Sequence, residues 1–297
     1  MRACGVDLVP NVDDASRVNP PLDGAVVDFY GYSRRPWRAL RFHRRAQRQG
    51  IPVLALDRDA PWFRGVRPSR LWLLSAFKAI DIYASHSLQG AQRYGTTSYY
   101  VPNGAWTNRY NLHGVTLEEL RQSARYRYDV TFVGNIDVKH YAEHTKRMVF
   151  LHELQRRLAA HSIRCDLIDS TTLPVEQQVD IIQRSRINLN AVAAADNGPE
   201  RSWGLPERCY GIPACGGFLI SDERRHAADD FTPEREWISF RDMDDAVHKI
   251  RHFMANFDAS RAIAEAAHKR VMAEHTYQHR AQRMIDLISA WREQHSQ

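Results

Sequence analysis

A polar, glycine-containing loop runs into a short predicted helix and then an apolar strand in the segment NGPERSWGLPERCYGIPACGGFLISD, residues 197–222. Gly198 and Gly204 carry no side chain, so a ligand could approach the loop backbone closely. Arg201 and Arg208 flank the predicted start of the helix. Backbone N–H groups, a helix start and guanidinium groups are what a diphosphate requires. The segment therefore favours a nucleotide-sugar site, with an ordinary helix-to-strand connection as the alternative.

Short apolar runs alternate with helical patterns along the whole chain, which predicts parallel βαβ units. A polar link at 107–127 separates two series of expected strands, which are 25–30, 51–57, 79–85 and 98–104, then 128–134, 163–169, 186–192 and 216–221. Helices are expected at 139–161, 174–184 and 206–215, followed by three more within 242–293. The sequence thus predicts an α/β protein with two Rossmann-like domains, 1–122 and 123–297, the second ending in a helical tail.

Length and composition are those of a globular protein with real cores, because the chain has 297 residues and 43% of them are hydrophobic. Apolar runs long enough to span a bilayer are missing from the sequence, and the N-terminal residues lack the pattern of a signal peptide. We therefore expect a soluble cytoplasmic protein that contacts no membrane. The four cysteines form no CxxC pair, so neither a zinc site nor a disulfide framework is expected.

Positive charge is concentrated in the first part of the chain. Residues 1–122 hold 17 Lys and Arg against 10 Asp and Glu, whereas residues 123–297 hold 24 against 25. Within SRRPWRALRFHRRAQRQG, a stripe of arginines at helical spacing is expected, with aromatic residues at its start. The residues predicted to bind an acceptor there are Tyr32, Arg34, Arg35, Trp37, Arg38, Arg41 and Arg45. This pattern favours a polyanionic partner, with a solvated helix face in an arginine-rich chain as the alternative.

Four motifs occur in an order that resembles the glycosyltransferase-like proteins of the CgeB/YkvP spore-maturation type. They are YDVTFVGN, RSRINLN, the 197–222 segment and AEHTYQHRAQRM, all within residues 128–285. Three looser matches, VDFYGY, GIPVLALDRDAPWF and YYVPNGAW, extend the resemblance into the N-terminal half. The resemblance implies the GT-B fold, in which two Rossmann-like domains face each other across a cleft. It also implies that the second domain binds a nucleotide sugar and the first domain an acceptor.

The resemblance also assigns roles to single residues. Arg208 matches the arginine that neutralises the departing diphosphate, and Gly134 and Asn135 match the phosphate-side loop after the first strand of the second domain. Gly211 stands where the family has a glutamate that binds ribose hydroxyls, so Glu207 or Glu200 would have to replace it. The full set of expected donor-binding residues is Gly134, Asn135, Asn197, Gly198, Glu200, Arg201, Trp203, Gly204, Glu207, Arg208, Tyr210 and Gly211.

The expected acceptor domain is shortened at its start, because VVDFYGY matches a point already inside the family's N-terminal domain. A small, open domain suits a large acceptor. The favoured acceptor is DNA that carries 5-hydroxymethylcytosine or a similar pyrimidine, which virus-encoded enzymes of this fold glycosylate in the host cytoplasm. A base within a duplex would have to be flipped out, with Trp62, Tyr32 or Trp106 as stacking partners. The competing acceptors are a spore or cell-surface polysaccharide and a teichoic-type polymer.

The resemblance implies a retaining transfer, most simply of glucose from UDP-glucose, in which the leaving diphosphate helps to deprotonate the acceptor. In an inverting enzyme, Asp28, Asp57 or Asp59 would be the candidate base, although such residues are also typical of helix caps and turns. Neither a metal nor a cofactor beyond the donor is expected, and His275 and His279 are read as packing or cleft-lining residues rather than metal ligands. The remaining alternative is an inactive relative that only binds nucleic acid or sugar.

Overall fold

The computed structural model describes residues 22–58, 66–86, 94–95, 97–136, 142–191 and 204–295. The chain divides into two compact units, which are residues 1–103 together with 278–297, and residues 104–277. This division differs from the expected boundary at 122/123. Residues 104–122 lie with the second unit because their leucines pack there, with Leu120 fully buried. Arg121 also forms a bidentate ion pair with Glu265 in that unit.

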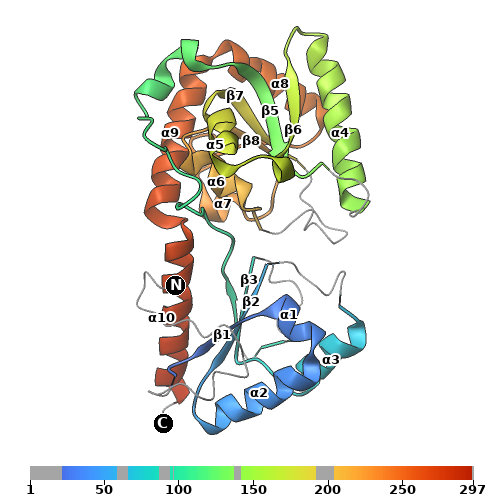
Figure 1. Ribbon diagram of the computed structural model, residues 1–297, viewed down its shortest axis with the longest axis vertical. Helices are drawn as coiled ribbons and strands as arrows, with labels where there is room; N and C mark the ends of the chain where they lie inside the picture. The colour runs from blue at the N-terminus through green and yellow to red at the C-terminus, as the bar shows by residue number, and fades with distance from the viewer. Residues whose placement is uncertain are drawn as a thin grey trace. The chain divides into compact units, whose positions relative to one another are not determined.

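The first unit contains a parallel sheet in the order β1-β2-β3-β4, made of Ala25–Asp28, Val53–Asp57, Ile82–Ser85 and Thr97–Tyr100. Three helices cover one face of this sheet (Figure 1), namely α1 (Phe29–Arg34), α2 (Pro36–Arg48) and α3 (Pro68–Ala76). Successive right-handed crossovers in one direction leave all connecting helices on the same face. The opposite face must therefore be covered by a segment from elsewhere in the chain.

That cover is the C-terminal helix α10 (Tyr277–His295). Its buried residues Met284, Leu287 and Ile288 pack against side chains of β2 and β3, and Figure 1 shows the helix alongside this sheet. The approach is close at Gly24, where a Cβ atom would lie 2.5 Å from Ile288 Cγ2. The tail is thus helical, as expected, but most of α10 belongs to the first unit rather than to the second.

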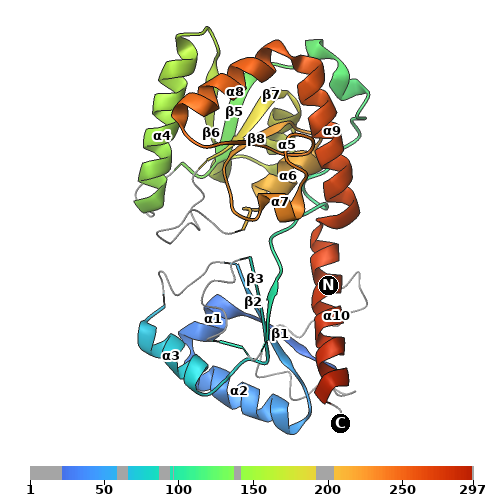
Figure 2. The ribbon, with the colours of Figure 1, turned by 180° about the vertical axis from the view of Figure 1, so that it is seen from behind.

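The second unit contains a parallel sheet in the order β6-β5-β7-β8-β9, made of Cys165–Asp169, Tyr128–Gly134, Ser185–Asn190, Leu219–Asp222 and Ile238–Phe240. Helices α4 (Ala142–Ala159) and α8 (Met243–Ala255) cover one face. Helices α5 (Val175–Gln183) and α6 (Arg208–Ala214) cover the other, and Figure 2 shows this unit from behind. The chain continues through α7 (Ala227–Asp230) and α9 (Phe257–Glu274).

The expected strands and helices are largely present, with displaced ends. The first expected strand stops at Asp28 because that residue caps α1 by accepting a hydrogen bond from Gly31 N. The strand β9 and the helix α7 were not predicted, since each is too short to show a periodic pattern. Within the described residues, none of the helices has the length and apolar character needed to cross a bilayer.

Candidate functional site

The second sheet has a switch point between β5 and β7, the place where ligands bind in open parallel sheets. The connection from β5 to β6, which contains α4, lies on one face of the sheet. The later connections, which contain α5 and α6, lie on the other face. A crevice is therefore expected outside the carboxyl ends of these two strands. Gly134 ends β5, with Asn135 directly after it, as predicted, and Asn190 ends β7.

Two arginines meet at this end of β5. The Cζ atom of Arg208, the first residue of α6, lies 4.6 Å from the centre of the Phe132 ring, and that of Arg147 lies 5.3 Å from the same centre. Arg147 comes from α4, is only 2% exposed and donates a hydrogen bond to the carbonyl oxygen of Asn135. The sequence predicted the place of Arg208 but gave no role to Arg147.

Gly134 permits this arrangement because it has no side chain. A Cβ atom there would lie 2.6 Å from Arg208 Nη2 and 2.9 Å from the Phe132 ring. A larger residue would therefore push the guanidinium away from the strand end.

Both guanidinium groups keep unused hydrogen-bond donors. Nη1 of Arg208 and Nε of Arg147 are buried, and neither has a hydrogen-bond partner among the described residues. Burial lowers the pKa of Arg147 to about 10, with the charge of Arg208 as a second cause, and burial also lowers the pKa of Arg208. Holding two buried like charges without a paired carboxylate is costly. An anion bound at this strand end would relieve that cost and take up the free donors.

A third arginine nearby is fully satisfied. Arg224 forms a buried bidentate pair with Asp222, with contacts of 3.1 Å to Oδ1 and 2.8 Å to Oδ2. Asn190 donates to the same carboxylate at 3.0 Å. The pair fixes the ends of β7 and β8 beside Arg208, but its charge is already balanced within the protein.

The Gly211 position, where the resemblance expects a glutamate, faces Tyr110. A Cβ atom there would lie 3.6 Å from Cγ of Tyr110, which is ordinary contact, and the Tyr110 hydroxyl donates to Gln178. Glu207 accepts a hydrogen bond from the Tyr277 hydroxyl at 3.0 Å. Burial raises the pKa of Tyr110, and the charge of Glu207 raises it further. Glu207 thus directly precedes Arg208 and lies near Tyr110, so it remains a candidate replacement for the missing glutamate.

Several predicted donor residues lie outside the described residues. They are Asn197, Gly198, Glu200, Arg201 and Trp203. Gly204 is described and buried, just before α6. Tyr210 is fully buried, and its hydroxyl donates to Asp230 Oδ2 at 2.6 Å, so it is a core residue rather than a ligand contact.

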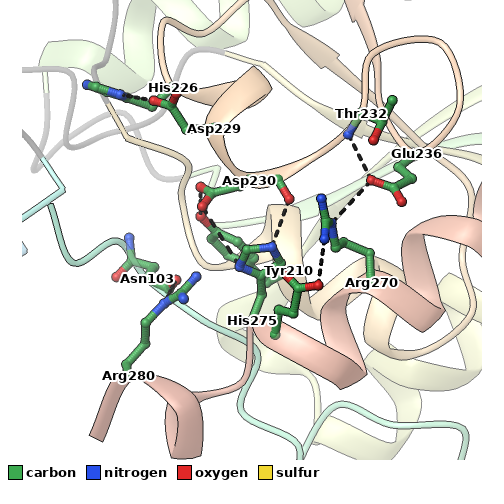
Figure 3. A network of polar contacts seen from close by, with 11 residues as sticks. Asn103, Tyr210, His226, Asp229, Asp230, Thr232, Glu236, Arg270, His275 and Arg280 are labelled. Carbon is green, nitrogen blue, oxygen red and sulfur yellow. Dashed lines mark hydrogen bonds and ion pairs between the residues drawn. The ribbon is translucent and has the colours of Figure 1, made fainter. Parts of the chain in front are cut away.

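Figure 3 shows Asp230 next to both Tyr210 and His275. Nε2 of His275 donates to the Asp230 carbonyl oxygen at 2.7 Å, and the ring packs against Tyr210 and Phe231. The packing role expected for His275 is confirmed. Among the described residues there is no group of three or more His, Cys, Asp or Glu side chains that could hold a metal ion.

Two of the three candidate bases in the first unit are engaged in the fold, and the third, Asp59, lies outside the described residues. Asp28 is the helix cap described above, and Asp57 is fully buried and accepts a 2.5 Å hydrogen bond from the Tyr83 hydroxyl. These contacts favour the structural interpretation of both carboxylates.

The predicted acceptor residues divide into exposed and buried ones. The stripe arginines and Trp37 are exposed, as expected. Tyr32 is not available for stacking, because it is 7% exposed and its hydroxyl donates to the carbonyl oxygens of Ala39 and Ala79. Trp106 is 41% exposed under the guanidinium of Arg109, but it lies in the second unit, and Trp62 lies outside the described residues.

Comparisons with known proteins agree with this architecture. The structure is similar to an α,α-trehalose-phosphate synthase from Burkholderia vietnamiensis, with a TM-score of 0.60 and 11% identity over 91% of this chain and 79% of that one. It is similar to Anabaena HepE in complex with UDP, with a TM-score of 0.59 and 11% identity over 86% and 77%. A third similar structure is an alpha-glucosyltransferase in complex with UDP and a DNA that contains a HMU base, with a TM-score of 0.58 and 10% identity over 94% and 83%.

At this level of identity the structural likeness establishes the fold, which is GT-B. A search among curated proteins gives no match. The family model described as glycosyl transferase-like matches residues 114–286, which is more than half of the chain and includes Arg147 and Arg208. The chain therefore belongs to the glycosyl transferase-like family.

Proposed function

We propose that the protein is a glycosyltransferase that takes its sugar from a nucleotide diphosphate sugar. The observation that carries this proposal is the pair Arg147 and Arg208 at the end of β5, which has buried free donors and no paired carboxylate among the described residues. A diphosphate matches both the charge and the hydrogen-bonding capacity of this pair. The family assignment supplies the reaction class.

In the proposed reaction the acceptor hydroxyl oxygen attacks the anomeric carbon of the sugar. A carbon–oxygen bond forms there, the bond from that carbon to the diphosphate breaks, and the diphosphate leaves with the electron pair and takes up the hydroxyl proton. Arg208 and Arg147 would hold the diphosphate and stabilise the growing negative charge. This path needs no protein base, in keeping with the engagement of Asp28 and Asp57 in the fold. We therefore propose a retaining transfer and expect EDTA to leave the rate unchanged.

We propose UDP-glucose as the donor and DNA with 5-hydroxymethylated pyrimidines as the acceptor. The UDP and the HMU-containing DNA named for one structural neighbour support this choice. The exposed arginines of α2 support it as well. A spore or cell-surface polymer as acceptor, which the resemblance of the motifs to the CgeB/YkvP type supports, is the competing proposal.

Diphosphate recognition is expected to appear as thermal stabilisation. UDP should raise the Tm more than UMP does, and uridine should have little effect, because only the diphosphate reaches both arginines. At about 100 times the Kd, the stabilisation amounts to about 2.7 kcal/mol. Replacing Arg147 by methionine should reduce the difference between UDP and UMP. Equal shifts from UDP and uridine would contradict a diphosphate site.

Transfer itself is tested with radiolabelled UDP-glucose and two DNAs of the same sequence, one plain and one containing 5-hydroxymethylcytosine. Label should enter the modified DNA alone, since only that DNA offers the acceptor hydroxyl. Label in a teichoic-type polymer or polysaccharide instead would favour the competing acceptor. Turnover with none of several nucleotide sugars, despite UDP binding, would indicate an inactive relative.

A further inference from the structure

Three helices on one face of the first sheet carry many arginines and no carboxylate. Helices α1, α2 and α3 include seven arginines and no Asp or Glu; of the residues that flank them, Arg35, Arg67 and Lys78 are basic and Asp28, the N-cap of α1, is acidic. We call these three helices with their flanking residues the arginine layer. Such a charge excess on one face of a domain is the electrostatic pattern of a polyanion-binding surface.

Arginine-rich composition alone does not explain this layer. In the second unit, arginines on helices pair with carboxylates one turn away, for example Arg156 with Glu153 and Arg270 with Glu274. On α2, five exposed arginines form no ion pair with any described residue, namely Arg35 at the helix cap, Arg41, Arg44, Arg45 and Arg48. Several helical arginines of the second unit are thus neutralised by neighbouring carboxylates, whereas these five arginines of the first unit are not.

The arginine layer also exposes large aromatic side chains. Trp37 in the first turn of α2 is 62% exposed, Trp72 in α3 is 65% exposed, and Phe77 just after α3 is 51% exposed. A hydrogen bond from Arg70 Nη1 to the carbonyl oxygen of Arg34 joins α3 to the end of α1, directly before α2. The exposed tryptophans thus belong to the same helical layer as the unpaired arginines.

We propose that the arginine layer binds single-stranded nucleic acid, with the arginines on phosphates and with unpaired bases stacked on Trp37 and Trp72. Arginines combined with exposed aromatic rings are typical of surfaces that hold single strands. A duplex hides its base faces and would leave the tryptophans unused. The consequence for catalysis, a preference for acceptor bases that are already unpaired, rests on the proposed function; the binding itself does not.

The binding test measures fluorescence anisotropy of a labelled single strand and of the same sequence as a duplex, at several salt concentrations. Binding to anionic phospholipid vesicles is measured in parallel. No nucleotide-sugar donor is present in these experiments. The single strand should bind more tightly than the duplex or the vesicles. Replacing Trp37 or Trp72 by alanine should weaken single-strand binding by roughly 10-fold and leave its salt dependence unchanged. Replacing Arg41, Arg44 and Arg45 together by alanine should lower the slope of log K against log salt by about 2.

Two exposed residues of the second unit supply matched controls. Arg251 in α8 forms no ion pair with a described residue, and Val149 in α4 is 66% exposed. Alanine at either position should leave binding unchanged. Equal affinity for strand and duplex with no effect of the tryptophan variants would overturn the proposal, as would binding to vesicles alone. The binding test contains no nucleotide-sugar donor, so a lack of selective single-strand binding does not depend on the diphosphate site. The diphosphate site is tested separately by the thermal shift with UDP.

Discussion

Replacing Arg208 by methionine should lower kcat/KM for glycosyl transfer by about 10²- to 10³-fold while leaving the free protein at least as stable as the parent. In the proposed reaction the guanidinium stabilises the negative charge that grows as the diphosphate leaves, so its loss should affect the transition state more than the bound donor. In the free protein, Nη1 has no partner among the described residues and burial opposes the charge. Methionine fills similar space without that cost. Transfer rates and Tm are measured on the same preparations.

The matched control is Arg224→Met, which removes a buried arginine of the opposite kind. Arg224 is paired with Asp222, so its loss leaves a buried carboxylate without its partner and should cost about 3–5 kcal/mol of unfolding free energy. The two variants should therefore differ in the sign or size of their Tm changes. A large loss of stability in the Arg208 variant with a normal transfer rate would show that Arg208 serves the fold and not the diphosphate.

The sequence predicted Arg208 but missed Arg147 for a physical reason. Arg208 lies within a loop-to-helix pattern that a diphosphate requires, whereas Arg147 lies inside a long helix where arginine is ordinary. Only the structure shows that Arg147 reaches the end of β5, where it contacts Asn135 and the Phe132 ring. One local signal existed, because Arg147 stands one turn before Leu151 and two turns before Leu154 on the buried side of α4. A cation on the apolar face of a helix indicates a partner of opposite charge, because a buried unpaired charge is costly.

Helical spacing located the arginine stripe but could not separate α1 from α2. Trp37 and the arginines belong to α2 and are exposed, whereas Tyr32 belongs to the short helix α1, whose orientation turns it into the core. The break between them at Arg35 precedes Pro36, and a residue before proline disfavours helical backbone. The exposed aromatic residue on α3 gave no sequence pattern of its own, since a lone tryptophan in an apolar helix is read as core.

The pattern of strands in the sequence does not show which unit the C-terminal helix packs against. Alternating strands and helices predicted a parallel first sheet, but a sheet whose crossovers all run in one direction buries only one face. The apolar residues of the tail were visible as a helix and equally compatible with either unit. Sheet order settles the question, because the bare face of β2 and β3 is where Met284, Leu287 and Ile288 pack.

Replacing Leu287 by aspartate should therefore unfold the first unit, although the substitution lies 10 residues from the C-terminal end of the chain. Leu287 is 5% exposed in the cluster with Leu54 and Ile82, and an unpaired carboxylate there should cost about 4 kcal/mol or more. That is a large part of the stability of a small domain. Limited proteolysis should cleave the first unit of the variant and spare the second, and thermal stabilisation by UDP should persist.

Ser289→Asp provides the control, since Ser289 is exposed on the same helix and receives the same charge. It should leave proteolysis and Tm close to those of the parent, because a solvated carboxylate in this position meets no apolar surface. If both variants behave like the parent, α10 is not needed to cover the first sheet. If both expose the first unit equally, the damage comes from added negative charge on the helix rather than from the lost contact with β2 and β3.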